Sequence, residues 1–146
     1  MTSTYRYIAE DSAGRPTVVL ADDHVRVLAR VRQILSPSYE VIAMVEDGWK
    51  AVQVVAKFHP DVAVLDILMP RLDGLEAARE IREMRCQTSI VFLTVQEDED
   101  YITAALAAGA KGYVVKSRLQ FDLVKAIEDA LLGRIFVSSR HPPSTR

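Results

Sequence analysis

The sequence has one cysteine, Cys86, so it cannot form a disulfide within the chain. A single thiol is typical of proteins in a reducing compartment, and it favours a cytoplasmic location. Aromatic residues make up only 7% of the sequence, and no apolar run approaches the roughly 18 residues of a membrane span. The first residues contain no apolar segment of the kind found in signal peptides. We therefore expect neither a disulfide framework nor a membrane partner.

An excess of charge of either sign is also missing. The sequence has 18 Lys and Arg against 20 Asp and Glu, which gives a net charge of −2. Domains that bind nucleic acid through their surface charge are usually basic. We therefore expect no direct nucleic-acid binding by this chain, whose 146 residues are enough for one globular domain.

Short apolar segments alternate with amphipathic segments along the chain. The apolar segments are typical of strands buried on both faces, and they lie at 17–21, 40–45, 61–66, 89–93 and 113–115. The amphipathic segments have apolar residues at helical spacing, and they lie at 24–35, 49–58, 72–85, 101–108 and 119–132. This alternation predicts an α/β fold with a doubly wound, five-stranded parallel sheet in the flavodoxin-like order 2-1-3-4-5. We expect a mobile N-terminal leader at 1–16, one domain at 17–134, and a C-terminal tail or truncated linker at 135–146.

Polar side chains stand at the ends of four of these strands. Asp22 and Asp23 follow the first strand, Asp66 ends the third, Thr94 follows the fourth, and Lys116 follows the fifth. A single Asp at such a place is equally well explained by a turn. Because parallel strands bring their carboxyl ends to one edge of the sheet, we expect these five side chains to converge in a binding site.

Three carboxylates in one place repel each other. Two carboxylates about 4 Å apart repel by about 4 kcal/mol at an effective dielectric constant near 20, and Lys116 alone offsets part of this. Either one carboxyl is protonated or a divalent cation is bound. Oxygen ligands without clustered His or Cys favour Mg²⁺ or Mn²⁺ over zinc. His24, beside the acid pair, could face the site, but we interpret it as a solvated residue at a helix start.

This set of residues resembles the receiver domain (CheY-like) of two-component response regulators. The resemblance runs from about Thr17 to Gly133, and it depends on Asp22-Asp23, on 66–74, on Leu93-Thr94 and on 108–116. Asp22-Asp23-His24, Gly112-Tyr113 and the ending at 133–138 look most like the NarL/FixJ (LuxR-type) class. Members of that class usually carry a helix-turn-helix DNA-binding domain after a linker.

The resemblance implies a phosphorelay role for the site. Asp66 would accept a phosphoryl group from a sensor histidine kinase. The resemblance also implies Mg²⁺ held by Asp22, Asp23, Asp66 and the backbone carbonyl of Leu68. Lys116 and Thr94 would contact phosphoryl oxygens, and Tyr113 would change rotamer as Thr94 moves. The switched surface would control an output, with a possible homodimer on phosphorylation, and we expect transcription through a DNA-binding domain that is absent here.

Two other classes of protein have to be weighed. One is an enzyme with an aspartyl-phosphate intermediate, such as a haloacid-dehalogenase-like phosphatase, which needs a second Asp two residues after the nucleophile, where this sequence has Leu68. We therefore expect no enzyme beyond self-catalysed phosphotransfer and autodephosphorylation. A phosphorylation-independent interaction module with the same fold is the alternative, and the complete set of acids, Thr94 and Lys116 argues against it. Ser117 stands where the family often has a proline, so we predict a trans peptide bond before it.

Overall fold

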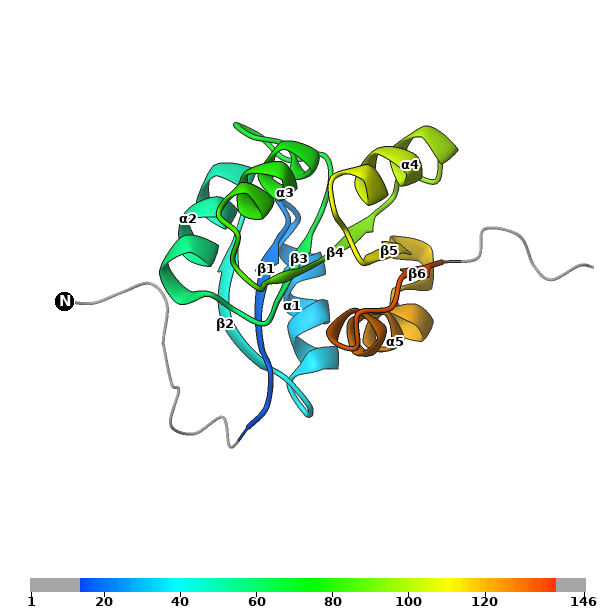
Figure 1. Ribbon diagram of the computed structural model, residues 1–146. Coiled ribbons are helices and arrows are strands. Elements are labelled where there is room, and N and C mark those ends of the chain that lie inside the picture. The colour runs from blue at the N-terminus through cyan, green and yellow to red at the C-terminus, as the bar shows by residue number, and fades with distance from the viewer. Residues whose placement is uncertain (1–13, 139–146) are drawn as a thin grey trace, which may run out of the picture.

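The computed structural model describes residues 14–138. Most of the predicted leader, and residues 139–146 of the predicted tail, lie outside the described residues. The strands are β1 (Thr17–Ala21), β2 (Glu40–Val45), β3 (Val62–Leu65), β4 (Ser89–Thr94), β5 (Gly112–Val115) and β6 (Phe136–Val137) (Figure 1). The helices are α1 (Val25–Leu35), α2 (Gly48–Phe58), α3 (Gly74–Glu83), α4 (Glu99–Ala107) and α5 (Leu119–Leu131). None of these helices is long and apolar enough to cross a bilayer.

All strand pairs in the sheet are parallel, and the strand order is β2-β1-β3-β4-β5-β6. The predicted α/β fold and the order of the first five strands are confirmed. The predicted number of strands is wrong, because β6 adds a sixth strand beside β5. Its apolar run, Ile135-Phe136-Val137, has only three residues and was included in the predicted tail, and so short a run does not by itself identify a strand.

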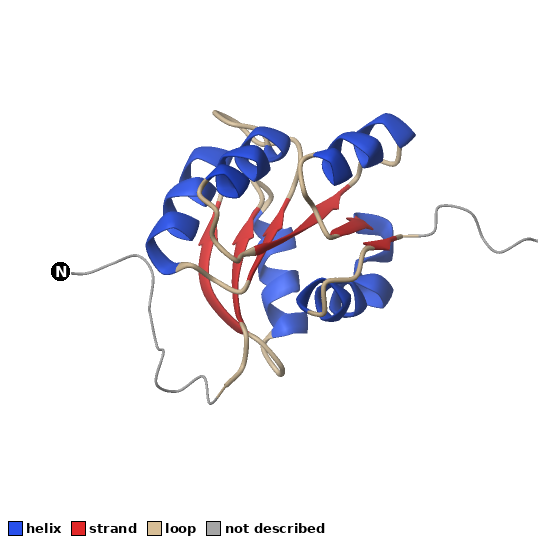
Figure 2. Ribbon diagram, in the orientation of Figure 1, coloured by secondary structure: helices blue, strands red, loops and turns tan. Residues whose placement is uncertain are grey.

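Helices cover both faces of the sheet, with α2, α3 and α4 on one face and α1 and α5 on the other (Figure 2). Each face has its own apolar core. Along β1, Val19 and Ala21 belong to the first core, whereas Val18 and Leu20 belong to the second. Both faces of the central strands are therefore buried, which explains why their sequences are apolar throughout.

Aspartates begin the three helices on the first face. The side chains of Asp47, Asp73 and Asp98 accept hydrogen bonds from backbone N–H groups in the first turns of α2, α3 and α4. By contrast, α5 follows a short 3₁₀ helix at Lys116–Arg118 and has no side-chain cap. No cis peptide bond occurs between residues 14 and 138, so the predicted trans bond before Ser117 is confirmed.

The residues after α5 are hydrogen-bonded to β5. The Phe136 N–H donates to the Lys111 carbonyl at 2.9 Å, and the Ser138 N–H donates to the Tyr113 carbonyl at 2.8 Å. The buried Ser138 hydroxyl accepts from the Val115 N–H at 3.2 Å and donates to Asp122 Oδ2 at 2.7 Å. Because Val115 directly precedes Lys116, this anchor holds the chain after α5 close to the end of β5.

Replacing Ser138 with Ala is expected to lower the free energy of unfolding by about 1–3 kcal/mol. The change removes one partner from the Val115 N–H and one from the buried Asp122 carboxylate, and a buried polar group is costly to leave without its partner. Urea denaturation measures the loss. Ser36→Ala is the control, since the exposed Ser36 hydroxyl makes only a local bond to the Arg32 carbonyl. Equal losses in the two variants would contradict the anchoring role of Ser138.

Candidate functional site

The backbone of neighbouring strands brings the two buried aspartates of the site together. The Asp22 N–H donates to the Val45 carbonyl at 3.0 Å, and the Asp66 N–H donates to the Ala21 carbonyl at 2.9 Å. These bonds continue the sheet one residue beyond β1 and β3, which are neighbours. Asp22 and Asp66 are 3% and 4% exposed. Two carboxylates that need solvation are thus withdrawn from water and depend on nearby cations and donors.

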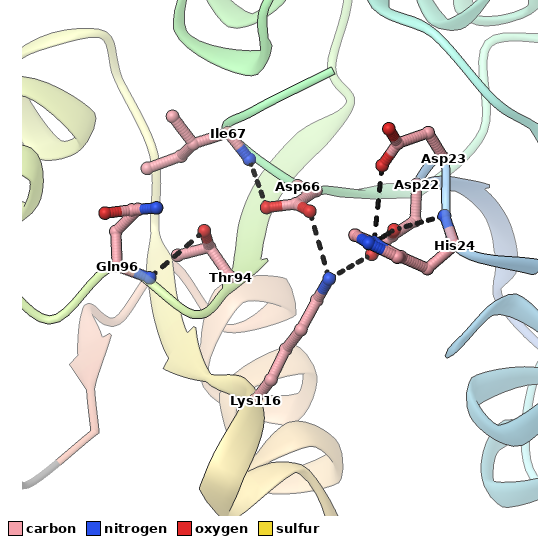
Figure 3. A network of polar contacts seen from close by, with 8 residues as sticks. All are labelled: Asp22, Asp23, His24, Asp66, Ile67, Thr94, Gln96 and Lys116. Carbon is pink, nitrogen blue, oxygen red and sulfur yellow. Dashed lines mark hydrogen bonds and ion pairs between the residues drawn. The ribbon is translucent and has the colours of Figure 1, made fainter. Parts of the chain in front are cut away.

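Lys116 supplies a positive charge between these two carboxylates (Figure 3). Its Nζ lies 2.8 Å from Asp22 Oδ2 and 3.0 Å from Asp66 Oδ2. Burial alone would lower the pKa of Lys116, but the hydrogen bonds and negative charges of Asp22 and Asp66 outweigh burial, and the pKa is raised. Lys116 therefore stays charged at neutral pH and offsets part of the repulsion between the two acids.

The second oxygen of Asp66 is held by the backbone. The Ile67 N–H donates to Asp66 Oδ1 at 2.7 Å, and the Ile67 carbonyl in turn accepts from the Gly74 N–H at 2.7 Å. The loop between β3 and α3 thereby fixes the orientation of the Asp66 carboxylate. The Leu68 side chain in this loop is 50% exposed, and the role of its backbone carbonyl as a ligand stays a prediction.

Asp23 and His24 complete a cluster of possible metal ligands at the edge of the sheet. Ligand atoms of Asp22, Asp23, His24 and Asp66 all lie within 4.8 Å of one another. Carboxylate oxygens are the ligands that Mg²⁺ and Mn²⁺ prefer, and Mg²⁺ usually takes one or two of them and keeps several waters. The donor set and the excess of negative charge therefore fit a hard divalent cation.

Thr94 lies beside Asp66, on the side away from Asp23 and His24 (Figure 3). Thr94 is fully buried, and its hydroxyl oxygen accepts from the Gln96 N–H at 3.4 Å. The Tyr113 hydroxyl donates to the carbonyl of the same Gln96 at 2.7 Å. Burial, followed by the negative charge of Asp66, raises the pKa of Tyr113. Gln96 thus links Thr94 to Tyr113 through its backbone.

The structure brings together Asp22, Asp23, Asp66, Thr94 and Lys116, the five side chains that were expected to converge. Sequence reasoning missed the backbone groups of Ile67 and Gln96, because any residue type can supply a backbone N–H or carbonyl. It also assigned His24 to a solvated helix start. The His24 side chain is indeed 65% exposed, but its Nδ1 lies 3.0 Å from Asp22 Oδ1.

Known proteins are similar to this chain over most of its length. Residues 18–128 match the family model of the response regulator receiver domain. The transcriptional regulatory protein DegU from Brevibacillus brevis is 35% identical over 130 residues, which are 88% of this chain and 54% of DegU. The chain thus spans about half the length of this relative.

Two solved structures have the same fold. A LuxR-family two-component response regulator from Aurantimonas is similar with a TM-score of 0.80 and 34% identity, over 84% of this chain and 89% of that one. The isolated REC domain of RcsB from Salmonella enterica serovar Typhimurium, solved with the phosphomimetic BeF₃⁻, has a TM-score of 0.78 and 27% identity. That match covers 86% of this chain and 94% of the RcsB domain. Because the family model matches residues 18–128, well over half of the sequence, this chain belongs to the response regulator receiver domains.

Proposed function

We propose that Asp66 is the phosphoacceptor of this receiver domain and takes its phosphoryl group from a sensor histidine kinase. The observation that carries the proposal is the position of Lys116 Nζ, 3.0 Å from Asp66 Oδ2 and 2.8 Å from Asp22 Oδ2. A cation at this place can neutralise the carboxylate before transfer and the phosphoryl oxygens after it. Phosphoryl transfer depends mainly on such positioning and charge neutralisation.

In the transfer step, a carboxylate oxygen of Asp66 forms a bond to phosphorus. The bond between phosphorus and the imidazole nitrogen of the donor histidine breaks, and its electron pair stays on that nitrogen. Both Asp66 oxygens are held before the step, Oδ2 by Lys116 and Oδ1 by the Ile67 N–H. A divalent cation bound by Asp22, Asp23 and Asp66, with the Leu68 carbonyl as a further ligand, would supply positive charge for the phosphoryl oxygens. Lys116 then moves its hydrogen bond from Asp66 to a phosphoryl oxygen.

The link through Gln96 gives the phosphoryl group a way to change the surface. Thr94 would hydrogen-bond a phosphoryl oxygen and shift toward Asp66. Because Gln96 contacts both Thr94 and Tyr113, this shift alters the hydrogen bond that holds the Tyr113 ring in place. The phosphoryl group thus favours one of two conformations by its differential contacts.

The proposed role of the whole protein is based on the relatives of this chain. DegU is a transcriptional regulatory protein, and the chain matches about half of it. We propose that phosphorylation promotes a homodimer and controls transcription through a DNA-binding domain beyond the receiver, in the cytoplasm. In this proposal the receiver begins at residue 17 and includes β6 and Ser138, which are hydrogen-bonded to β5, so it extends past the predicted boundary at 134. Hydrolysis of the phosphoryl group on Asp66 returns the domain to its first state, without turnover of a separate substrate.

Intact-mass spectrometry after incubation with acetyl phosphate and Mg²⁺ tests the proposal. We expect one added phosphoryl group on the wild type, and none on Asp66→Asn or in EDTA. Asp73→Asn is the matched control and keeps the adduct, because Asp73 caps α3 and Asn is an equally good cap. An adduct on Asp66→Asn would overturn the assignment. If the wild type took up neither the phosphoryl group nor BeF₃⁻, the chain would be a phosphorylation-independent interaction module.

A further inference from the structure

The imidazole of His24 faces the two acids that follow β1. His24 Nδ1 lies 3.0 Å from Asp22 Oδ1 and 3.3 Å from Asp23 Oδ1 (Figure 3). The backbone places it there, since the His24 N–H donates to Asp22 Oδ1 at 2.8 Å. His24 has an extended conformation just before α1, and its side chain does not cap the helix. The ring is 65% exposed, so its contacts with the two carboxylates, rather than helix capping or burial, determine its position.

These distances match the spacing of neighbouring ligands around a first-row transition metal. Two ligand atoms about 2.1 Å from one ion, at tetrahedral or octahedral angles, are roughly 3.0–3.4 Å apart. The two observed separations, 3.0 and 3.3 Å, fall in this range. The distances therefore permit Nδ1 to share one ion with both carboxylates, and they equally permit a hydrogen bond from Nδ1 to Asp22.

We infer that His24 is a metal ligand that shifts the preference of this site from Mg²⁺ toward divalent transition ions such as Mn²⁺, Co²⁺ and Zn²⁺. Imidazole nitrogen suits transition ions, whereas Mg²⁺ binds almost only oxygen ligands. Asp22, Asp23 and Asp66 provide the oxygen ligands that both kinds of ion accept. The inference rests on the metal site of the proposed function and adds a nitrogen ligand to it.

If the His24 ring were a hydrogen-bond donor instead of a metal ligand, its replacement would change the metal-ion affinities in a different way. If Nδ1 carries a proton and donates to Asp22 and Asp23, His24 only positions the two carboxylates. Its replacement would then change the affinity for Mg²⁺ and for transition ions by the same factor. If His24 is a metal ligand, its replacement weakens the binding of transition ions but not that of Mg²⁺. The ratio of the two affinities therefore distinguishes a metal ligand from a residue that only positions the carboxylates.

Titration calorimetry of the wild type and His24→Ala with Mg²⁺ and with Mn²⁺ measures this ratio. We expect the Mn²⁺ affinity of His24→Ala to fall about tenfold or more, and the Mg²⁺ affinity to change less than about threefold. His59→Asn is the control. His59 ends α2 with a φ of 48°, a conformation that Asn tolerates, and it is not part of the ligand cluster. This variant keeps both affinities.

Pulsed electron paramagnetic resonance of the Mn²⁺ complex gives a direct readout. We expect hyperfine coupling to a bound imidazole nitrogen in the wild type and in His59→Asn, and its loss in His24→Ala. Equal weakening of both ions, or no nitrogen coupling in the wild type, would overturn the inference and leave the proposed function intact. A wild type that binds neither Mg²⁺ nor Mn²⁺ would overturn the metal site itself.

Discussion

Replacing Lys116 with Met is expected to destabilise the metal-free protein and to make its stability strongly dependent on Mg²⁺. Lys116 Nζ contacts Asp22 and Asp66, at 2.8 and 3.0 Å, and both acids are buried. Removing one partner of a buried ion pair leaves an uncompensated charge and costs about 3–5 kcal/mol. We expect a loss near 3 kcal/mol, the lower end of this range, because the Lys116 side chain is 12% exposed and the group of charges is not fully withdrawn from water. In a domain of this size that lowers the melting temperature by roughly 10 °C.

Mg²⁺ is expected to restore most of this stability. Lys116 and a bound cation compete for the same two carboxylates, so the variant loses a repulsion that weakens cation binding in the wild type. If loss of this repulsion makes Mg²⁺ binding more favourable by only about 1.4 kcal/mol, the affinity for Mg²⁺ rises tenfold. Ligands that bind the folded state stabilise it by mass action. Thermal denaturation over a series of Mg²⁺ concentrations should therefore show a much larger rise in melting temperature for Lys116→Met than for the wild type.

Lys125→Met is the matched control for the loss of a lysine charge. Lys125 Nζ lies 3.1 Å from Asp129 Oδ1 on α5, but the Lys125 side chain is 57% exposed. Asp129 is buried, but the Lys125 ammonium reaches water, so loss of this pair should cost about 1 kcal/mol, much less than loss of Lys116. Lys125→Met should respond to Mg²⁺ as the wild type does. A Lys116→Met protein that behaved like Lys125→Met would contradict the role of Lys116 as the counter-charge of the site.

The sequence was sufficient to predict the first five strands and the convergence of the site. Buried parallel strands have continuous apolar sequences, and the polar residue that ends each of them marks one edge of the sheet. Asp66 after Leu65 and Lys116 after Val115 are examples, since an ionisable residue directly follows a fully apolar run. Such a signal is local, so it can be read without knowledge of the tertiary structure.

Other features had a weak local signal or none. The strand β6 is two residues long, and it forms because Phe136 hydrogen-bonds to Lys111 and Ser138 hydrogen-bonds to β5, more than 20 residues earlier in the chain. The contact of Lys116 with Asp22 and the contacts of the His24 ring depend on side-chain orientation at the sheet edge. The predicted helix at 72–85 begins two residues before α3, so it included Asp73, which caps α3, and no local pattern indicates which backbone packs against Gly74.

Replacing Gly74 with Ala is expected to lower the free energy of unfolding by more than about 4 kcal/mol, or to prevent folding. A Cβ atom at Gly74 would overlap the carbonyl oxygen of Asp66 and lie 2.9 Å from Ile67 Cα. Both neighbours are backbone atoms, and Asp66 is held by its bond to the Ala21 carbonyl. The clash can be relieved only if α3 moves away from β3 or if the backbone that carries the phosphoacceptor is displaced.

Gly133→Ala separates this steric effect from backbone strain. Gly133 has a φ of +78°, and a Cβ atom there would meet nothing within 4 Å. A left-handed conformation costs an Ala about 1–2 kcal/mol, so Gly133→Ala should fold with a modest loss in urea denaturation. If Gly74→Ala folds, a lower yield of the acetyl phosphate adduct than in Gly133→Ala would show that Asp66 has moved. Equal stability of the two variants would mean that the backbone at the start of α3 can move at little cost in free energy. Close packing at Gly74 would then not be what positions Asp66.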